Sequence, residues 1–168
     1  LVTGASQGAH TLNETIGQNL EAFLKEGYVI HVHGKYDGEW LQAQRAALSN
    51  GLKEKYLLFD YLHDTMSDAL LAADLAVWRA GASSLGELPA AGLPAVLVPL
   101  PHGGVQQADN ARWLQERGGA VTVEDNRARQ ELLPTVQEIL TDDEKLQGMR
   151  AAMRQMAHPN AAKNIADL

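Results

Sequence analysis

The sequence lacks cysteine and any long apolar run, and these two absences narrow what the protein can be. Without cysteine, disulfides and thiolate metal ligands are excluded, and a reducing, cytoplasmic setting fits. No apolar run approaches the roughly 20 residues that a transmembrane helix needs. Basic residues are also scarce: 14 Lys and Arg against 21 Asp and Glu give a net charge of −7. This balance argues against a partner that is nucleic acid.

The pattern that is present is that of one α/β domain of 168 residues. Short apolar runs alternate with segments of helical period, which is typical of a parallel sheet with helical crossovers. The expected strands cover residues 1–3, 28–33, 56–59, 75–78, 95–98 and 120–123. The expected helices cover residues 11–26, 38–50, 66–73, 84–91 and 106–117. We therefore predict a Rossmann-like, doubly wound parallel sheet of about six strands.

Both ends of the chain carry further expectations. Residues 1–3 are short for a strand, so the start of the domain is expected to be truncated and a further part to lie upstream. Residues 129–168 are expected to form a C-terminal helical segment of two or three helices, the last beginning at Pro159.

Four loops follow the expected strands and hold the unusual residues. They cover residues 4–10, 60–65, 79–84 and 99–105, and ligands of doubly wound sheets bind at such carboxyl ends. The first loop, Gly4-Ala5-Ser6-Gln7-Gly8-Ala9, allows a close approach of backbone to a ligand and precedes a helix start that favours an anion. It matches neither the dinucleotide fingerprint nor the P-loop. Taken alone, this loop is explained equally well as a tight turn between strand and helix that binds no ligand.

The loop after the fourth strand contains Arg79 and leads to Ala82-Ser83-Ser84, with Glu87 one turn later. Two interpretations stay open. In one, Ser84 and Glu87 form a capping box that only closes the helix start. In the other, free N–H groups and hydroxyls hold a phosphate, while the two carboxylate oxygens of Glu87 accept hydrogen bonds from a ribose diol.

The loop after the fifth strand ends in two neighbouring amides, Gln106 and Gln107. Each amide offers a donor and an acceptor, which suits the hydroxyls of a sugar, although solvated polar residues at a helix start would look the same. His102 in this loop is a weak candidate for a general base, and His31 and His33 on one strand lack a further ligand at metal-binding spacing.

Taken together, these loops resemble the MurG family of GT-B glycosyltransferases, a group similar to glycosyltransferase family 28. The likeness covers its C-terminal, donor-binding domain and runs in order through almost the whole chain. The segments that carry it are Gly4 to Ala9 with Leu12-Asn13, Tyr61-Leu62 with Met66, Arg79 to Glu87 with Ala91-Gly92-Leu93-Pro94, and Val98-Pro99 through Gln106-Gln107 to Asn110-Ala111. The chain departs from the family at Ala5, where a second glycine is usual.

The resemblance implies a donor, UDP-N-acetylglucosamine (UDP-GlcNAc), and a place for each of its parts. Backbone at Leu62 and His63 would read the uracil, with Met66 against the base. Glu87 would bind the ribose, and Gln106 and Gln107 would hold the GlcNAc hydroxyls. The remaining expected substrate contacts gather at the diphosphate end: Ser6, Gln7, Arg79, Ala82, Ser83 and Ser84.

The same resemblance implies partners and a location. An N-terminal acceptor domain of the same protein would supply the general base and the lipid-linked acceptor, so no catalytic residue is expected in this chain. GlcNAc would pass to lipid I, forming lipid II for peptidoglycan at the inner face of the cell membrane, by a peripheral protein with no metal or other cofactor. The alternatives are another UDP-sugar transferase of GT-B fold, an epimerase-like enzyme, or a non-catalytic subunit that needs a partner chain.

Overall fold

Six parallel strands form a single sheet in the computed structural model, which describes residues 1–4, 9–101 and 105–167. The strands are β1 (Val2–Thr3), β2 (Val29–Val32), β3 (Tyr56–Phe59), β4 (Ala76–Trp78), β5 (Ala95–Leu97) and β6 (Ala120–Thr122). Their order across the sheet is β3-β2-β1-β4-β5-β6, and every pairing is parallel. The predicted fold class and the position of each predicted strand are confirmed.

Helices connect the strands and close the chain. They are α1 (His10–Gln18), α2 (Leu20–Glu26), α3 (Gly38–Ala47), α4 (Asn50–Lys53), α5 (Met66–Ala72), α6 (Ser84–Ala91), α7 (Val105–Glu116), the 3-10 helix η1 (Asp125–Arg127), α8 (Ala128–Thr141), α9 (Asp143–Gln155) and α10 (Ala161–Ala166). The last helix begins at Ala161 with Asn160 as its cap, so the prediction that it starts at Pro159 was wrong by two residues.

Two predicted helices are each split in two. The segment 11–26 breaks at Asn19, whose side-chain Nδ2 donates to the carbonyl of Thr15 while its backbone N–H turns to the carbonyl of Ile16. A side-chain amide that competes for a helical carbonyl in this way favours a helix end. The segment 38–50 breaks at Leu48 and Ser49, which are extended.

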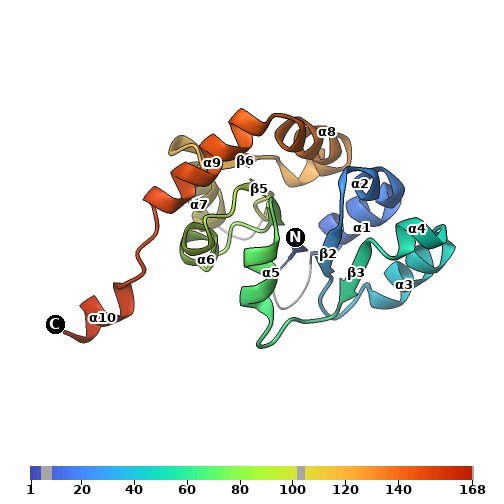
Figure 1. Ribbon diagram of the computed structural model, residues 1–168, viewed down its shortest axis with the longest axis horizontal. Coiled ribbons are helices and arrows are strands. Elements are labelled where there is room, and N and C mark those ends of the chain that lie inside the picture. The colour runs from blue at the N-terminus through green and yellow to red at the C-terminus, as the bar shows by residue number, and fades with distance from the viewer. Residues whose placement is uncertain (5–8, 102–104, 168) are drawn as a thin grey trace.

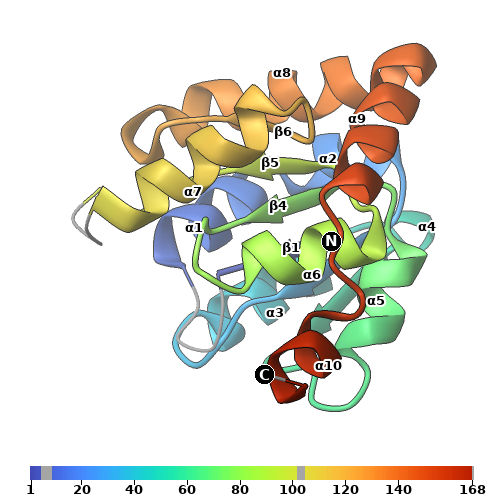
Figure 2. The same cartoon turned by 90° about the vertical axis from the view of Figure 1, so that its left-hand side faces the viewer.

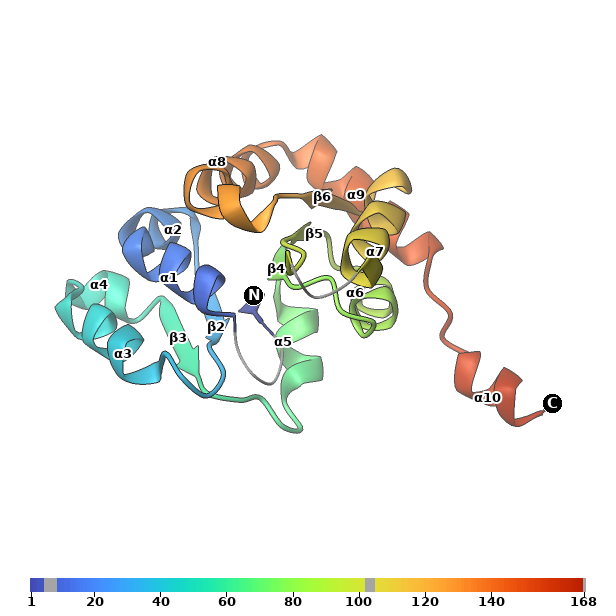
Figure 3. The ribbon, with the colours of Figure 1, turned by 180° about the vertical axis from the view of Figure 1, so that it is seen from behind.

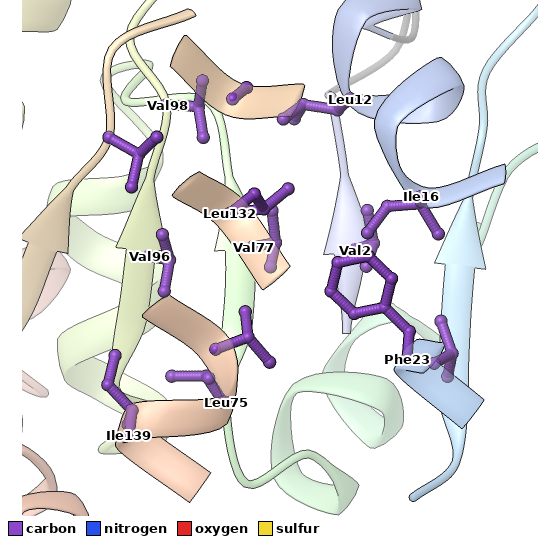
Figure 4. Close-up of a cluster of buried hydrophobic side chains, with 14 of the residues drawn as sticks. Val2, Leu12, Ile16, Phe23, Leu75, Val77, Val96, Val98, Leu132 and Ile139 are labelled. Carbon is purple, nitrogen blue, oxygen red and sulfur yellow. The ribbon is translucent and has the colours of Figure 1, made fainter. Parts of the chain in front are cut away.

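The sheet has a hydrophobic core on each face. On one face, Leu12 and Ile16 lie one helical turn apart on α1 and pack with Leu132 of α8 over the strands, as Figure 4 shows. On the other face, α5, α6, α7 and α9 cover the strands with a second buried cluster that includes Trp78 and Met153. Figure 2 shows α6 and α7 in front of the strands and α1 and α2 behind them. The central strands β1, β4 and β5 are thus buried on both faces, whereas the edge strand β3 exposes Leu57 and Phe59. The packed centre of the sheet holds the carboxyl ends of β1 and β4 in place for the loops that follow them.

The C-terminal helix α10 stands apart from this layered body. Figures 1 and 3 show it at the end of an extended segment that follows α9. Ile165 on α10 is exposed. Among the helices of the described part of the chain, none combines the length and the apolar character that a bilayer crossing requires.

Candidate functional site

The order of the strands reverses between β1 and β4. The chain runs outward from β1 through β2 to β3 on one side, and from β4 through β5 to β6 on the other. Ligands of doubly wound sheets bind at the carboxyl ends beside this reversal. Helices α1 and α6 begin there, because they follow β1 and β4. The predicted contacts Ser6 and Gln7 lie outside the described residues, as does His102.

The start of α6 offers two unused peptide N–H groups. Those of Ser84, Leu85 and Gly86 donate to carbonyls of the preceding turn, whereas those of Ala82 and Ser83 make no hydrogen bond within the described residues. Ala82 and Ser83 are exposed. A helix start with free N–H groups attracts an anion.

Ser84 differs from its two neighbours. Its hydroxyl donates to the carbonyl of Gly81 at 2.5 Å, and the residue is fully buried. The hydroxyl therefore shapes the turn before α6, whereas Ala82 and Ser83 are exposed to solvent.

The capping box expected as one reading of Ser84 and Glu87 does not form. Ser83, not Ser84, is the N-cap of α6, and no side chain caps the helix. The Glu87 carboxylate is exposed and has no hydrogen-bond partner among the described residues. It remains free to accept hydrogen bonds from a ligand one turn beyond the free N–H groups.

Arg79 at the end of β4 is occupied by the protein itself. Its guanidinium donates to the carbonyls of Val98 (3.0 Å) and Pro99 (3.4 Å) and lies 2.5 Å from the Asp125 carboxylate. Asp125 also accepts a hydrogen bond from the Thr11 hydroxyl. The predicted ligand contact Arg79 is thus buried and joins the loops after β4, β5 and β6 to the start of α1. Sequence patterns could not indicate Asp125, because a single acidic residue after a strand belongs to no motif.

Two amide side chains of helix α7 form hydrogen bonds to these loops. Gln107 accepts a hydrogen bond from the Leu100 N–H, and Asn110 donates to the carbonyl of Ala80. Gln106 is exposed without a partner among the described residues. The two predicted sugar contacts therefore differ: Gln106 contacts no other polar group of the described residues, and Gln107 uses its carbonyl oxygen to hold Leu100 in the loop after β5.

The predicted base-binding loop lies between β3 and α5. The Leu62 side chain is buried, so only its backbone can face a ligand, and Met66 packs partly buried at the start of α5. His63 is exposed, with its ring edge-on to Tyr61 at 4.7 Å between centroids. Because α5 packs beside α6, this loop and Glu87 lie on neighbouring elements.

A polar cluster that sequence reasoning missed lies beside β1, under the loop between β2 and α3. Asn13 of α1 is fully buried and bonds to His31, to the carbonyl of His33 and to Asp37. Tyr56 bonds to the second ring nitrogen of His31 at 2.7 Å. The alternation of His31 and His33 was visible in the sequence, but their partners come from other elements.

Burial sets the protonation of this cluster. It lowers the pKa of His31 to about 3 and raises that of the Tyr56 hydroxyl, so both are neutral at pH 7. Burial also opposes ionisation of Asp37, but hydrogen bonds from Asn13 and His10, with the charges of His10 and His33, prevail and lower its pKa. Asp37 is therefore a carboxylate.

Comparison with known proteins identifies the family of this chain. The model of the glycosyltransferase family 28 C-terminal domain matches residues 1–165. Two curated relatives are both described as UDP-N-acetylglucosamine--N-acetylmuramyl-(pentapeptide) pyrophosphoryl-undecaprenol N-acetylglucosamine transferases. The protein of Roseiflexus sp. (strain RS-1) is 40% identical over 188 residues, which cover 100% of this chain and 42% of the relative. The protein of Mycolicibacterium vanbaalenii is 39% identical over 170 residues, which cover 100% of the chain and 41% of the relative.

Solved structures agree on the fold. The crystal structure of Acinetobacter baumannii MurG matches with a TM-score of 0.81 and 30% identity, over 99% of this chain and 49% of that one. A glycosyltransferase of kitacinnamycin matches with a TM-score of 0.61 at 20% identity, over 99% of this chain and 41% of that one, and supports the fold alone. The chain thus spans less than half the length of the proteins it matches.

Proposed function

The chain belongs to the glycosyltransferase family 28 C-terminal domain family, and from this premise we propose that it binds the donor UDP-GlcNAc for an inverting glycosyl transfer. The observation that carries the proposal is the start of α6, where the N–H groups of Ala82 and Ser83 and the carboxylate of Glu87 lie within one turn and have no hydrogen-bond partner among the described residues. A diphosphate next to a diol is the ligand chemistry that fits this pair of features.

The donor then extends across the carboxyl edge. Its uracil lies at the backbone of Leu62 and His63 beside Met66, its ribose at Glu87, and its diphosphate at Ala82 and Ser83. The neighbouring positions of α5 and α6 support this order. The sugar extends past the diphosphate toward Gln106 on α7, whose amide is free.

The chemistry that this arrangement supports is electrostatic. An acceptor hydroxyl attacks the anomeric carbon of GlcNAc, the bond from that carbon to the diphosphate breaks, and UDP leaves with the electron pair. The N–H groups at the start of α6 stabilise the negative charge that grows on the leaving diphosphate. Arg79 and Gln107 act indirectly: Arg79 supports the loop that leads to these N–H groups, and Gln107 holds the loop after β5 through Leu100.

We propose further that the acceptor is a lipid-linked pyrophosphoryl sugar, as in the names of the relatives, and that an acceptor-binding domain of the same protein presents it. The reaction would then take place at the inner face of the cell membrane, with the protein bound there peripherally.

The test of this function is a transfer assay with the complete protein, radiolabelled UDP-GlcNAc and a lipid-linked acceptor. The proposal predicts label in the lipid product and release of UDP. Release of free labelled sugar instead would favour an epimerase-like enzyme, and an absence of both products would contradict the proposal.

A further inference from the structure

The sheet has an open position in its middle, at the amino end of β1. Strand β2 begins two residues before His31, which lies opposite Val2 of β1. On the other side of β1, the backbone nitrogen of Leu1 donates to the carbonyl of Leu75, just ahead of β4, at 2.9 Å. Among the described residues, none continues β1 between these two neighbours. The first residues of β2 and the segment ahead of β4 therefore face each other across a gap that is one strand wide.

A groove of about 450 Å³ occupies this gap. It passes through the plane of the sheet, because its lining comes from both hydrophobic cores. The core under α1, α2 and α8 contributes Phe23, Leu75 and Val136, and the core under α5 and α6 contributes Leu1, Ile30 and Ala73. A small molecule bound on one face of a sheet contacts one core, whereas a strand sends successive side chains to both faces. The lining therefore fits a strand.

The register of β1 gives the place of the residue that directly precedes Leu1. It would lie one position before Leu1 in both pairings, opposite Val29 of β2 and Leu75. Both of these neighbours are buried. Its side chain would point to the same face as Val2, toward Phe23 of α2, whose ring Figure 4 shows near Val2. An apolar side chain fits there, whereas a charged one would be buried without a partner.

The groove opens to solvent one position further upstream. At that position the neighbours on the two sides would be Tyr28 and Asp74. Tyr28 is 73% exposed, and the side chain of Asp74 is 73% exposed as well. A continuation of β1 is therefore short, and it leaves the sheet at the edge opposite to the carboxyl ends where the donor is proposed to bind.

We propose that this groove holds the residues that directly precede Leu1 in the complete protein, as a continuation of β1. The inference rests on the proposed function above in one respect, namely that an acceptor-binding domain precedes this one in the same protein. The lengths of the relatives support such a domain, because the chain covers 42% and 41% of them. The connection from the acceptor-binding domain then ends as a strand inside the sheet of the donor-binding domain, and is part of its core.

Substitutions in the complete protein test this placement. Asp in place of the residue directly before Leu1 would bury a charge without a partner, so the melting temperature should fall by roughly 5 °C or more. Val at the same position should leave the melting temperature unchanged. The matched control is Asp several residues further upstream, outside the groove, which should shift the melting temperature by less than about 1 °C.

Hydrogen exchange of the unsubstituted protein is a second test, and it does not depend on a variant that folds. The backbone amides of the two residues before Leu1 should exchange as slowly as those of β1. Equal tolerance of Asp and Val directly before Leu1 would overturn the inference, and so would exchange of these amides as fast as in an unstructured linker. Neither measurement involves UDP or the transfer of GlcNAc, so the transfer assay decides the proposed function separately.

Discussion

The guanidinium of Arg79 lies 2.5 Å from the carboxylate of Asp125, and this ion pair joins the end of β4 to the short helix after β6. The two side chains are only 7% and 14% exposed. The pair supports the loop that carries Ala82 and Ser83. Because the Arg79 guanidinium contacts Asp125 and the Val98 carbonyl, it is turned away from solvent. The main contribution of the Arg79–Asp125 ion pair is to hold the loop after β4 in position.

Removal of one partner should therefore cost stability. Asp125→Ala leaves a buried guanidinium unpaired, and such a loss typically destabilises by about 3–5 kcal/mol. We expect a lower free energy of unfolding in urea and a weaker affinity for UDP. The matched control is Asp109→Ala, which breaks the exposed pair with Arg112 and should change stability by less than about 1 kcal/mol. Equal effects of the two substitutions would contradict a special role for the buried pair.

Glu87→Gln should separate binding from stability. The Glu87 carboxylate caps nothing in the structure, so its neutral analogue should leave the melting temperature unchanged. Hydrogen bonds to a charged acceptor are worth about 1.5–3 kcal/mol, so UDP affinity should fall roughly 10- to 150-fold. Calorimetry and thermal melts measure the two effects, with Glu116→Gln on the exposed surface of α7 as the control. A melting shift at unaltered affinity would count against the ribose role.

The two glutamines of α7 should behave differently. Gln106→Ala should spare the affinity for UDP and remove the additional affinity of UDP-GlcNAc. Gln107→Ala should instead remove the hydrogen bond that the Leu100 N–H donates to Gln107, and so destabilise the protein by about 0.5–1.5 kcal/mol. Titration of each variant with both ligands, beside urea unfolding, tests this difference. If Gln106→Ala lowered the affinity for UDP as much as the affinity for UDP-GlcNAc, the proposed orientation of the donor would be wrong.

Stability should depend on pH through His31. Its pKa in the folded protein is lowered from 6.5 to about 3, so below pH 6.5 the unfolded chain takes up a proton that the folded one does not. The stabilisation is complete above pH 6.5 and is lost as pH falls, by up to about 1.4 kcal/mol per pH unit. Urea unfolding between pH 7 and 5 should show this slope, and His31→Gln should reduce it. An unchanged slope in the variant would contradict the buried, neutral state of His31.

The sheet was predictable because its strands are short apolar runs, and the central strands β1, β4 and β5 are buried on both faces. The positions of the loops at its carboxyl edge were predictable too, because each loop follows one of these apolar runs. The break at Asn19 was not, since it depends on a side chain taking the Thr15 carbonyl from the backbone. The ion pair of Arg79 with Asp125 joins distant segments that the pairing of β4 with β5 and of β5 with β6 brings together. The cluster around Asn13 likewise depends on the pairing of β2 with β1 and β3. A sequence shows the types of such residues but not their partners.

Calorimetric titration of the chain with UDP, UDP-GlcNAc, NAD, ATP and GDP tests most directly whether the edge beside α6 is a uridine-diphosphate site. We predict that UDP and UDP-GlcNAc bind more tightly than the other three, and that Glu87→Gln removes this preference. NAD binding as tightly as UDP, or more tightly, would contradict a uridine-diphosphate site and favour a dinucleotide site on the same sheet.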